Sequence, residues 1–342
     1  MIQEIMKKNQ CDELHIKYDS ESGCTFLIAL NTSYNHKCNG GIRMMQYPTL
    51  KEAIEDVTKL AGAMTKKCIV IGRDKNMGFS GGKAVIIGDP KKQKTARMFK
   101  RFGQFIQSFN GKFQAGRDLN ISVKDLGLIA KGTEYVDGLE TGLGDGGIPT
   151  AHGVFIAMKT MCKLKKENLK DKIIAIQGVG SVGAELIRLL TAEGAKVIIS
   201  DIDEKNLENL NVEKVKPEEI YNVKCDIFSP NACGGVLTKE NVKKLKCKMI
   251  IGAANNQLAS EEVMDIIKKR NIDYVPDYVA NIGGLFLSFC ELQRLSMDFA
   301  LEKIKEIIQK RLKKIVRMAE ENQETLWVTT EKIITKEIIK QQ

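Results

Sequence analysis

Gly178-Val179-Gly180-Ser181-Val182-Gly183 stands directly after the apolar run Ile173-Ile174-Ala175-Ile176 and directly before a segment with helical periodicity. This is the G-x-G-x-x-G pattern that links a buried parallel strand to a helix. The first glycine permits a tight turn, the second lets a pyrophosphate approach the backbone, and the third allows helix and strand to pack closely. The helix N-terminus attracts the phosphates. The stretch therefore predicts a doubly wound α/β sheet that binds a dinucleotide.

Two further positions sharpen the prediction of this site. The next strand, Val197 to Ser200, ends at Asp201. An acidic residue there binds both adenosine ribose hydroxyls and repels a 2′-phosphate, which favours NAD over NADP. Asn255 follows another apolar run at 249–252, where an amide would face the nicotinamide crevice. A simple Asn-rich turn explains Asn255 equally well.

Working outward, the periodicity of apolar residues predicts the remaining elements. Residues 12–30 indicate a β-hairpin with Phe26, Ile28 and Leu30 on one face. Thr49 and Glu52 have the form of a capping box, which predicts a helix over 50–66. The other expected strands are 68–72, 84–88, 173–176, 196–200, 225–228, 248–252 and 273–275, and the other expected helices are 91–109, 150–163, 181–194 and two in 297–340.

A glycine-rich stretch beginning near residue 137 predicts a hinge between two domains. We expect an α/β substrate and oligomerisation domain over 1–136, joined by the C-terminal helices at about 297–342. The second domain, over 137–296, is expected to be a Rossmann, doubly wound NAD-binding domain. A chain of 342 residues is long enough for both.

Composition excludes several classes of protein. No apolar run is long enough to span a membrane, and the first residues lack the pattern of a secretory signal. The nine cysteines are scattered without a metal-binding spacing, which predicts free thiols in a reducing cytoplasm and no metal site. The net charge of +10 comes from lysines interleaved with glutamates, without the aromatic residues typical of RNA-binding proteins. A role with nucleic acid is therefore the weakest interpretation.

Two lysines stand in settings unusual for solvated charges. Lys67 precedes the apolar segment 68–71, and Lys83 lies between Gly81-Gly82 and the strand-like run 84–87. Burial lowers the pKa of a lysine, and repulsion between two close lysines lowers it further. A neutral amine near pH 7 is a general base. A surface lysine at the start of a strand explains Lys83 equally well from its local sequence.

Five segments together resemble the glutamate/leucine/phenylalanine/valine dehydrogenases, and most closely the leucine dehydrogenase branch. They are GGIRMMQYPTLKEAIEDVTKLAGAMTKK (40–67), SGGKAVIIGDP (80–90), IAIQGVGSVG (174–183), GAANNQL (252–258) and PDYVANIGG (276–284). The resemblance extends from about residue 12 to the end. It implies an oligomer, from dimer to octamer, that oxidises an L-amino acid with NAD to a 2-oxo acid and ammonia. The implied substrate is aliphatic or branched, such as leucine or valine.

The resemblance also implies the role of individual residues. Lys67 would hold the substrate carboxylate, Lys83 would activate water, and Asp118 would handle the amine proton. By its local sequence alone Asp118 would be a helix or turn cap. The remaining matches are Gly40 and Gly41, which would line the cleft, and Thr150 and Asn255, which would lie near nicotinamide or substrate.

The chain departs from this family at three places. The segment between the two lysines is longer, with extra residues 73–76. Arg117 stands beside Asp118 in place of an acidic residue and would lower its pKa. The positions that form the family's side-chain pocket carry Asn39, Leu285 and Ser288.

Polar groups left unpaired in a buried pocket cost about 1–3 kcal/mol each. Asn39 and Ser288 therefore leave two interpretations open: the substrate is an amino acid with a more polar, larger or unusual side chain, or a water fills the gap. A third reading is a catalytically silent NAD-binding paralogue, which the presence of Lys67, Lys83 and Asp118 together disfavours.

Overall fold

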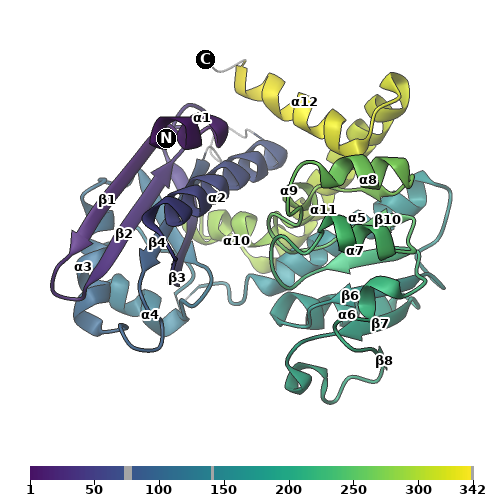
Figure 1. Ribbon diagram of the computed structural model, residues 1–342, viewed down its shortest axis with the longest axis horizontal. Coiled ribbons are helices and arrows are strands. Elements are labelled where there is room, and N and C mark those ends of the chain that lie inside the picture. Colours follow the sequence, from purple (N-terminus) through teal and green to yellow (C-terminus); the bar gives the residue numbers. More distant parts are fainter. Residues whose placement is uncertain (73–78, 140–141, 340–342) are drawn as a thin grey trace. The chain divides into compact units, whose positions relative to one another are not determined.

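The computed structural model describes residues 1–72, 79–139 and 142–339, which form two compact units (Figure 1). The first unit comprises Met1–Asp145, Leu287–Ser296 and Lys336–Gln342. The second comprises Gly146–Phe286 and Met297–Thr335. Among the helices that the structure describes, none has the length and hydropathy of a membrane span.

The first unit is built on a five-stranded sheet with the order β1-β2-β4-β3-β5. Strands β1 and β2 form the predicted hairpin, and β2 pairs antiparallel with β4, whereas β3 runs parallel to both β4 and β5. The strand bounds are β1 Glu13–Asp19, β2 Cys24–Leu30, β3 Cys38–Met45, β4 Ser80–Ile87 and β5 Phe113–Arg117.

Alternation along these strands divides their side chains between two faces. Cys38, Ile42 and Phe113 pack in one core with helices α3 (Ala96–Gln107) and α4 (Val123–Ile129). The opposite face packs against α1 (Ile2–Lys8) and α2 (Leu50–Ile71), in a core that contains Leu27, Ala29 and Val85 (Figure 1). Every second residue of β3, β4 and β5 therefore projects toward the side of the sheet that α2 covers.

Helix α2 begins as predicted, with the Thr49 hydroxyl accepting a hydrogen bond from the Glu52 amide. It does not end near residue 66, and the strand expected at 68–72 is wrong. The helix continues to Ile71 and ends at Gly72, whose φ is +95°. A short apolar run fits a buried helix as well as a strand, and here both Ile69 and Val70 are buried within the helix.

Strand β4 begins four residues earlier than predicted, so Gly81 and Gly82 are part of the strand. A Cβ at Gly81 would lie 2.2 Å from the Ala61 carbonyl oxygen of α2. The glycine therefore allows the helix to lie directly on the strand. Strands β3 and β5 were not predicted.

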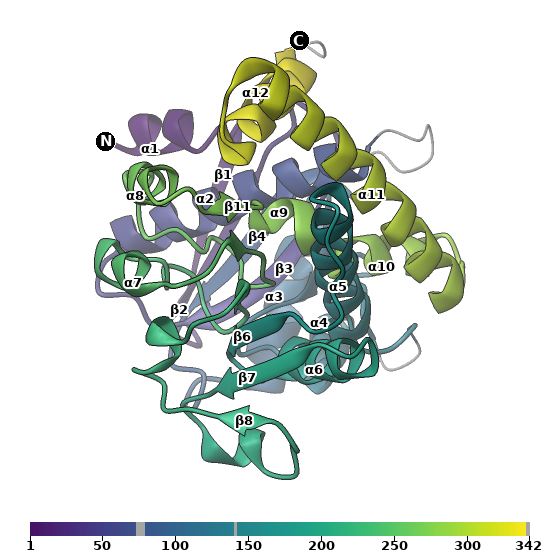
Figure 2. The same ribbon diagram turned by 90° about the vertical axis from the view of Figure 1, so that its right-hand side faces the viewer.

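The second unit contains a six-stranded parallel sheet with the order β11-β10-β9-β6-β7-β8, which is the Rossmann order. Helices α5 and α6 lie together on one side of β6 and β7, and α7 and α8 lie on the other (Figure 2). The strands are β6 Ile173–Gln177, β7 Lys196–Ser200, β8 Glu213–Lys214, β9 Ile227–Pro230, β10 Met249–Ile250 and β11 Asp273–Tyr274. The helices are α5 Gly147–Leu164, α6 Ser181–Ala192, α7 Lys239–Lys244, α8 Val263–Lys269, α9 Asp277–Ala280, α10 Gly283–Leu292, α11 Met297–Asn322 and α12 Leu326–Ile339.

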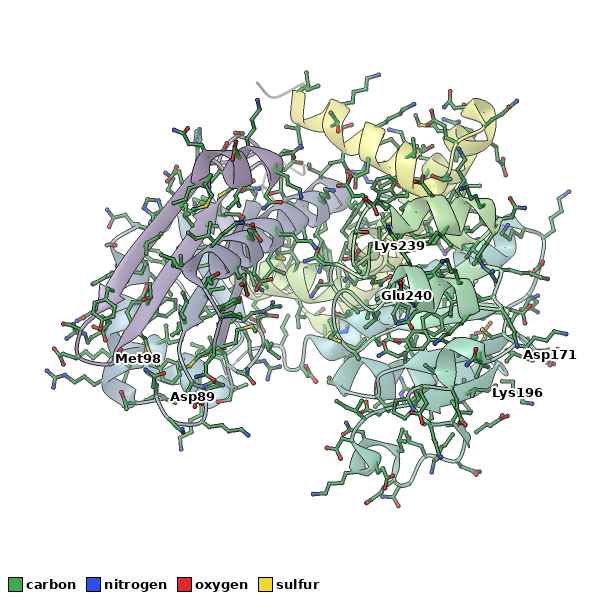
Figure 3. The ribbon with its side chains drawn as sticks, in the orientation of Figure 1. Asp89, Met98, Asp171, Lys196, Lys239 and Glu240 are labelled. Carbon is green, nitrogen blue, oxygen red and sulfur yellow. The ribbon has the colours of Figure 1, made fainter. Side chains whose placement is uncertain are left out.

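The two ends of the parallel strands differ in function. Asp171 and Lys196, labelled in Figure 3, lie at the amino ends of β6 and β7. The carboxyl ends of the same strands carry the glycine turn that begins at Gly178 and the carboxylate of Asp201. Ligands of such sheets bind at the carboxyl edge. The predicted fold class, an α/β protein of two domains with a Rossmann sheet and C-terminal helices, is confirmed.

Candidate active site

A cluster of acidic and basic side chains, with Lys83 buried and the others partly buried, lies on the α2 side of the first sheet. Lys83 Nζ is 2.9 Å from Asp118 Oδ2, and Arg43 Nε donates to the same oxygen at 2.9 Å. Arg43 Nη1 also donates to Asp56 Oδ2 at 2.9 Å, and the Tyr47 hydroxyl donates to that oxygen at 2.6 Å. We call Arg43, Asp56, Lys83 and Asp118 the ionic cluster.

The fold explains why these four residues meet. Arg43 on β3 and Lys83 on β4 are alternate-face residues that project toward α2. Asp118 follows β5 directly, and Asp56 lies on α2 itself. The cluster thus joins three neighbouring parallel strands to the helix that covers them.

Burial and neighbouring charges shift the pKa values within the ionic cluster. Burial is the largest influence on Lys83 and lowers its pKa; the carboxylate of Asp118 opposes this, and the positive charge of Arg43 adds to it. For Asp118, burial favours the neutral form, but the charges of Lys83 and Arg43 outweigh it and hold the pKa at about 2. At neutral pH Asp118 is therefore ionised, and Lys83 releases its proton more readily than a solvated lysine.

The pKa of Asp118 is lowered, but Arg117 is not among its main influences. Arg117 Nη2 donates to Asp145 Oδ1 at 3.3 Å, and the two side chains are 40% and 45% exposed. The charges that lower the pKa of Asp118 are those of Lys83 and Arg43. Arg43 also supplies a positive charge that lowers the pKa of Lys83, the effect that its sequence setting suggested for a second lysine.

Lys67 lies in the C-terminal part of α2 and is buried, with 7% of its surface exposed; Lys83 is 4% exposed. Both lysines are therefore buried, as their sequence settings indicated. The role of Lys67 in holding a substrate carboxylate remains a prediction.

The paired glycines Gly40 and Gly41 occupy opposite faces of β3. A Cβ at Gly40 would lie 1.7 Å from the Gly82 carbonyl oxygen, so close strand packing requires a glycine there. Gly41 lies on the α2 side, opposite Gly116 of β5. A Cβ at Gly116 would meet no described heavy atom within 4 Å. The sheet therefore has open space above Gly116, next to the ionic cluster.

A second buried cluster lies farther along the same strands. The Asn39 amide donates to Asp137 Oδ2 at 3.0 Å and to Ser288 Oγ at 2.9 Å. The Ser288 hydroxyl also donates to Asp137 Oδ2, and the Gln114 amide donates to Asp137 Oδ1. We call Asn39, Gln114, Asp137 and Ser288 the polar cluster.

This arrangement bears on the argument that Asn39 and Ser288 would be costly against an aliphatic substrate if they were left unpaired. Both hydrogen-bond to Asp137, so the expected cost of unpaired groups does not arise. Burial raises the pKa of Asp137 to about 6, and the three hydrogen bonds oppose this rise only in part.

Leu285 and the extra residues 73–76 were the other two departures from the family pattern. Leu285 lies on α10 in the second unit and is half-buried, and its role in a pocket remains a prediction. The extra residues 73–76 lie outside the described part of the chain.

The glycine turn of the second unit has the local geometry that a dinucleotide needs. Gly178 has a φ of +97°, and a Cβ at Gly183 would lie 2.3 Å from the Gly178 carbonyl oxygen. A Cβ at Gly180 would meet no described heavy atom within 4 Å, which leaves its backbone open to a pyrophosphate. Helix α6 begins with Ser181 and Val182, and the Asp201 carboxylate accepts a hydrogen bond from the Val179 amide at 2.7 Å. These residues fit the group that the sequence implied.

Asn255 and Thr150 also lie in the second unit. The Asn281 amide donates to Asn255 Oδ1 at 3.1 Å and to the Ala253 carbonyl oxygen at 2.9 Å, which fixes the exposed Asn255 just after β10. The Thr150 hydroxyl donates to the Gly146 carbonyl oxygen at 2.7 Å and accepts from the Gly284 amide at 3.0 Å. Both side chains are thus held in place by neighbouring backbone or amide groups.

Sequence reasoning missed four members of the two clusters: Arg43, Asp56, Gln114 and Asp137. Arg43 had a detectable signal, because it stands two residues after Gly41 and so shares its strand face. Gln114 and Asp137 had none, because β5 was not predicted. Within the described residues no three His, Cys, Asp or Glu side chains group as a metal site would need, and the nine cysteines are free thiols.

Family comparisons match most of the chain. The Glutamate/Leucine/Phenylalanine/Valine dehydrogenase model matches residues 146–204 and 199–341. The model of the Glu/Leu/Phe/Val dehydrogenase dimerisation domain matches residues 9–137.

Individual proteins are similar over comparable lengths. A leucine dehydrogenase from Thermoactinomyces intermedius is 38% identical over 317 residues, which cover 90% of this chain and 86% of that protein. A phenylalanine dehydrogenase from Lysinibacillus sphaericus is 38% identical over 303 residues, which cover 84% and 78%. The crystal structure of L-tryptophan dehydrogenase from Nostoc punctiforme superimposes with a TM-score of 0.81 at 29% identity, covering 100% of this chain and 99% of that one.

Proposed function

The chain belongs to the glutamate/leucine/phenylalanine/valine dehydrogenase family, and we propose that it uses NAD to convert an L-amino acid reversibly to a 2-oxo acid and ammonia. It is an amino acid dehydrogenase, and the resemblance inferred from its motifs is confirmed. The observation that carries the proposed chemistry is the buried ion pair of Lys83 and Asp118, in which the lysine has a lowered pKa.

We assign the steps to residues of the ionic cluster and its neighbour Lys67. Lys67 binds the substrate carboxylate as a permanent cation. Ionised Asp118 accepts a hydrogen bond from the substrate amine and receives its proton as the Cα–H bond breaks. The dinucleotide, when bound, supplies the acceptor for the hydride from Cα. Lys83 Nζ then takes a proton from water, whose oxygen attacks the imino carbon, and returns the proton as ammonia leaves.

The lowered pKa of Lys83 suits this role, because a base is most effective when its pKa lies near the working pH. Arg43 serves a different purpose: it keeps Asp118 ionised and oriented through a hydrogen bond of 2.9 Å. It is therefore a positioning residue in this scheme.

The preference for NAD rests on Asp201. Its carboxylate lies beside the glycine turn, hydrogen-bonded to the Val179 amide, and would accept both adenosine ribose hydroxyls while repelling a 2′-phosphate. We assign substrate binding to the first unit, which includes Asp137 and Ser288, and cofactor binding to the second unit, which carries the glycine turn and Asp201.

We also propose a homo-oligomer, because residues 9–137 match a domain described as a dimerisation domain. The substrate's side chain is not fixed by the relatives, which include leucine and phenylalanine dehydrogenases. An aliphatic substrate is compatible with that set.

The test is formation of NADH from a panel of L-amino acids by the wild type and by Lys83→Ala. General bases contribute about 10²–10⁴-fold to rate, so the variant should lose at least about a hundredfold in kcat while it binds NAD normally. Lys196→Ala, at the exposed amino end of β7, is the matched control and should keep full activity. Near-normal turnover by Lys83→Ala would defeat the assignment. Tight NAD binding without turnover of any amino acid would indicate a silent paralogue.

A further inference from the structure

We propose that the polar cluster binds the end of the substrate's side chain and that the preferred substrate is an L-amino acid with a terminal side-chain amine, of ornithine or lysine length. This inference rests on the proposed function and names its substrate class. Asp137 would be the residue that recognises the amine.

The register of the strands sets the distance between the two clusters. Asn39 lies opposite Gln114, and Gly41 lies opposite Gly116. Since Ile42 pairs with Ala84, Lys83 is level with Gly41. The row of Asn39 and Gln114 is therefore two residues from the row of Lys83, or about 7 Å along a parallel strand.

A substrate held at Lys83 and Asp118 can extend its side chain along this direction. Gly116 lies level with Lys83 on the same face and carries no side chain to block this direction, whereas a Cβ at Gly41 would lie 2.8 Å from the Arg117 carbonyl oxygen. The space above Gly116 contains no described heavy atom within 4 Å of where a Cβ would be. Extended side chains of ornithine and lysine span roughly the distance between the two rows.

The charge of Asp137 selects the chemistry of that side chain. Its three partners, Asn39, Gln114 and Ser288, are neutral hydrogen-bond donors. No lysine, arginine or histidine in the described part of the chain forms an ion pair with it. A buried carboxylate without a positive partner is unfavourable, and a cationic ligand would relieve this.

The hydrogen-bonding capacity of Asp137 also favours a ligand that carries an N–H donor. A carboxylate has about four acceptor positions, of which the cluster fills three, two on Oδ2 and one on Oδ1. The position left on Oδ1 suits a single N–H donor. Because the pKa of Asp137 is about 6, most of the carboxylate is ionised at pH 7 and can pair with an ammonium group.

An aliphatic side chain would leave the charge of Asp137 without a counter-ion and its free acceptor position without a hydrogen bond. The cost of such unpaired groups corresponds to about a tenfold to hundredfold loss in kcat/KM. The useful comparison is between lysine, which has a terminal amine, and norleucine, which ends in a methyl group. Ornithine is a second amino acid with a terminal amine, and leucine is a second aliphatic one.

The experiment measures kcat/KM for these four amino acids in the wild type, Asp137→Asn and Asp137→Leu. We expect the wild type to favour ornithine or lysine over norleucine by at least about tenfold. Asp137→Asn should lose that preference mainly through KM for the amines, and Asp137→Leu should reverse it. Asp265→Asn removes the same charge from the exposed surface of α8 and should keep the wild-type ranking.

A wild-type preference for leucine or norleucine with normal turnover would overturn the inference and leave the proposed function intact. An unchanged ranking in Asp137→Asn would overturn it as well. If no amino acid is turned over, the proposed function fails, and ligand-induced change in Tm decides the inference. Stabilisation by ornithine of the wild type but not of Asp137→Asn supports it, and equal stabilisation of both defeats it.

Discussion

Asp118, which is partly buried, and Asp137, which is buried, are two carboxylates of the same unit with opposite properties. Burial favours the neutral form of both. Asp118 nevertheless has a pKa of about 2, whereas that of Asp137 is about 6. The difference comes from their neighbours. Asp118 contacts the cations Lys83 and Arg43, whereas the side chains that hydrogen-bond to Asp137 in the described part of the chain are neutral and the charge of Glu291 raises its pKa further. The identity of the neighbours, and not the depth of burial, thus decides the charge of each group.

The comparison also separates two kinds of site. The ionic cluster contains its own counter-charges, so Asp118 stays ionised over a wide pH range, and the cluster is suited to chemistry that is the same for every amino acid. The polar cluster lacks a counter-charge among the described residues and is suited to a group that a ligand supplies. Reaction and selectivity are therefore assigned to different carboxylates, in two clusters whose rows at Lys83 and at Asn39 are two strand residues apart.

The largest effect should follow removal of the charge of Asp118. Asp118→Asn cannot take up the amine proton and leaves Lys83 and Arg43 without their shared carboxylate. We expect kcat to fall by about 10²–10⁴-fold with every substrate, while binding of NAD is unchanged. Steady-state rates and NAD titration check this. Since Asp137→Asn should alter only the ranking of substrates, a uniform loss in that variant too would erase the distinction between the clusters.

The second prediction concerns stability and pH. The pKa of Asp137 is raised on folding, from 3.8 to about 6, so its contribution is fully present below about pH 4 and is lost as pH rises through 6. This corresponds to about 2–3 kcal/mol between pH 4 and pH 7. The wild type should lose this stability as pH rises from 4 to 7, and Asp137→Asn should not. The free energy of unfolding of the variant minus that of the wild type should therefore increase by about that amount over this range.

Urea unfolding at several pH values measures this difference. Asp118 has the opposite sign, because its pKa is lowered: its contribution is present above about pH 4 and is lost as pH falls toward 2. Asp118→Asn should therefore show no corresponding gain between pH 4 and pH 7. If the difference in free energy of unfolding between Asp137→Asn and the wild type does not change with pH, the pKa of Asp137 is not raised on folding.

Sequence patterns predicted the second unit better than the first. Its strands are short apolar runs separated by turns, and the glycine turn with Asp201 fixes the order of sheet, helix and ligand. In the first unit, β3 contains Asn39, Gly40, Gly41 and Arg43, which resemble a loop until the strand is paired. The apolar end of α2 was read as a strand because a short buried run has no period that distinguishes the two.

The same limit applies to the candidate site. Lys67, Lys83 and Asp118 were identified because they stand in recognisable motifs. The partners that set their chemistry come from other strands, and Arg43 approaches Asp118 only because β3 and β5 pair in parallel. The nearest charge in sequence, Arg117, was chosen instead. Proximity along the chain is a poor guide where strand pairing decides proximity in space.

The smallest expected effect tests that last point. Arg117→Ala removes an ion pair of 3.3 Å to Asp145 whose side chains are 40% and 45% exposed, so the free energy of unfolding should change by no more than about 0.5 kcal/mol. The pH at which activity rises should not move, because Arg117 is not among the main influences on Lys83 or Asp118. Arg43→Gln is the variant to compare with Arg117→Ala, because it removes a charge from the ionic cluster itself.

Loss of the positive charge of Arg43 should raise the pKa of Lys83 and shift the rise in activity to higher pH, because that charge now lowers the pKa. The pH dependence of kcat/KM for the two variants, measured side by side, checks both expectations. An equal shift in Arg117→Ala would show that a solvated arginine controls the base as strongly as a buried one. It would then follow that the ionic cluster does not derive its properties from its own counter-charges.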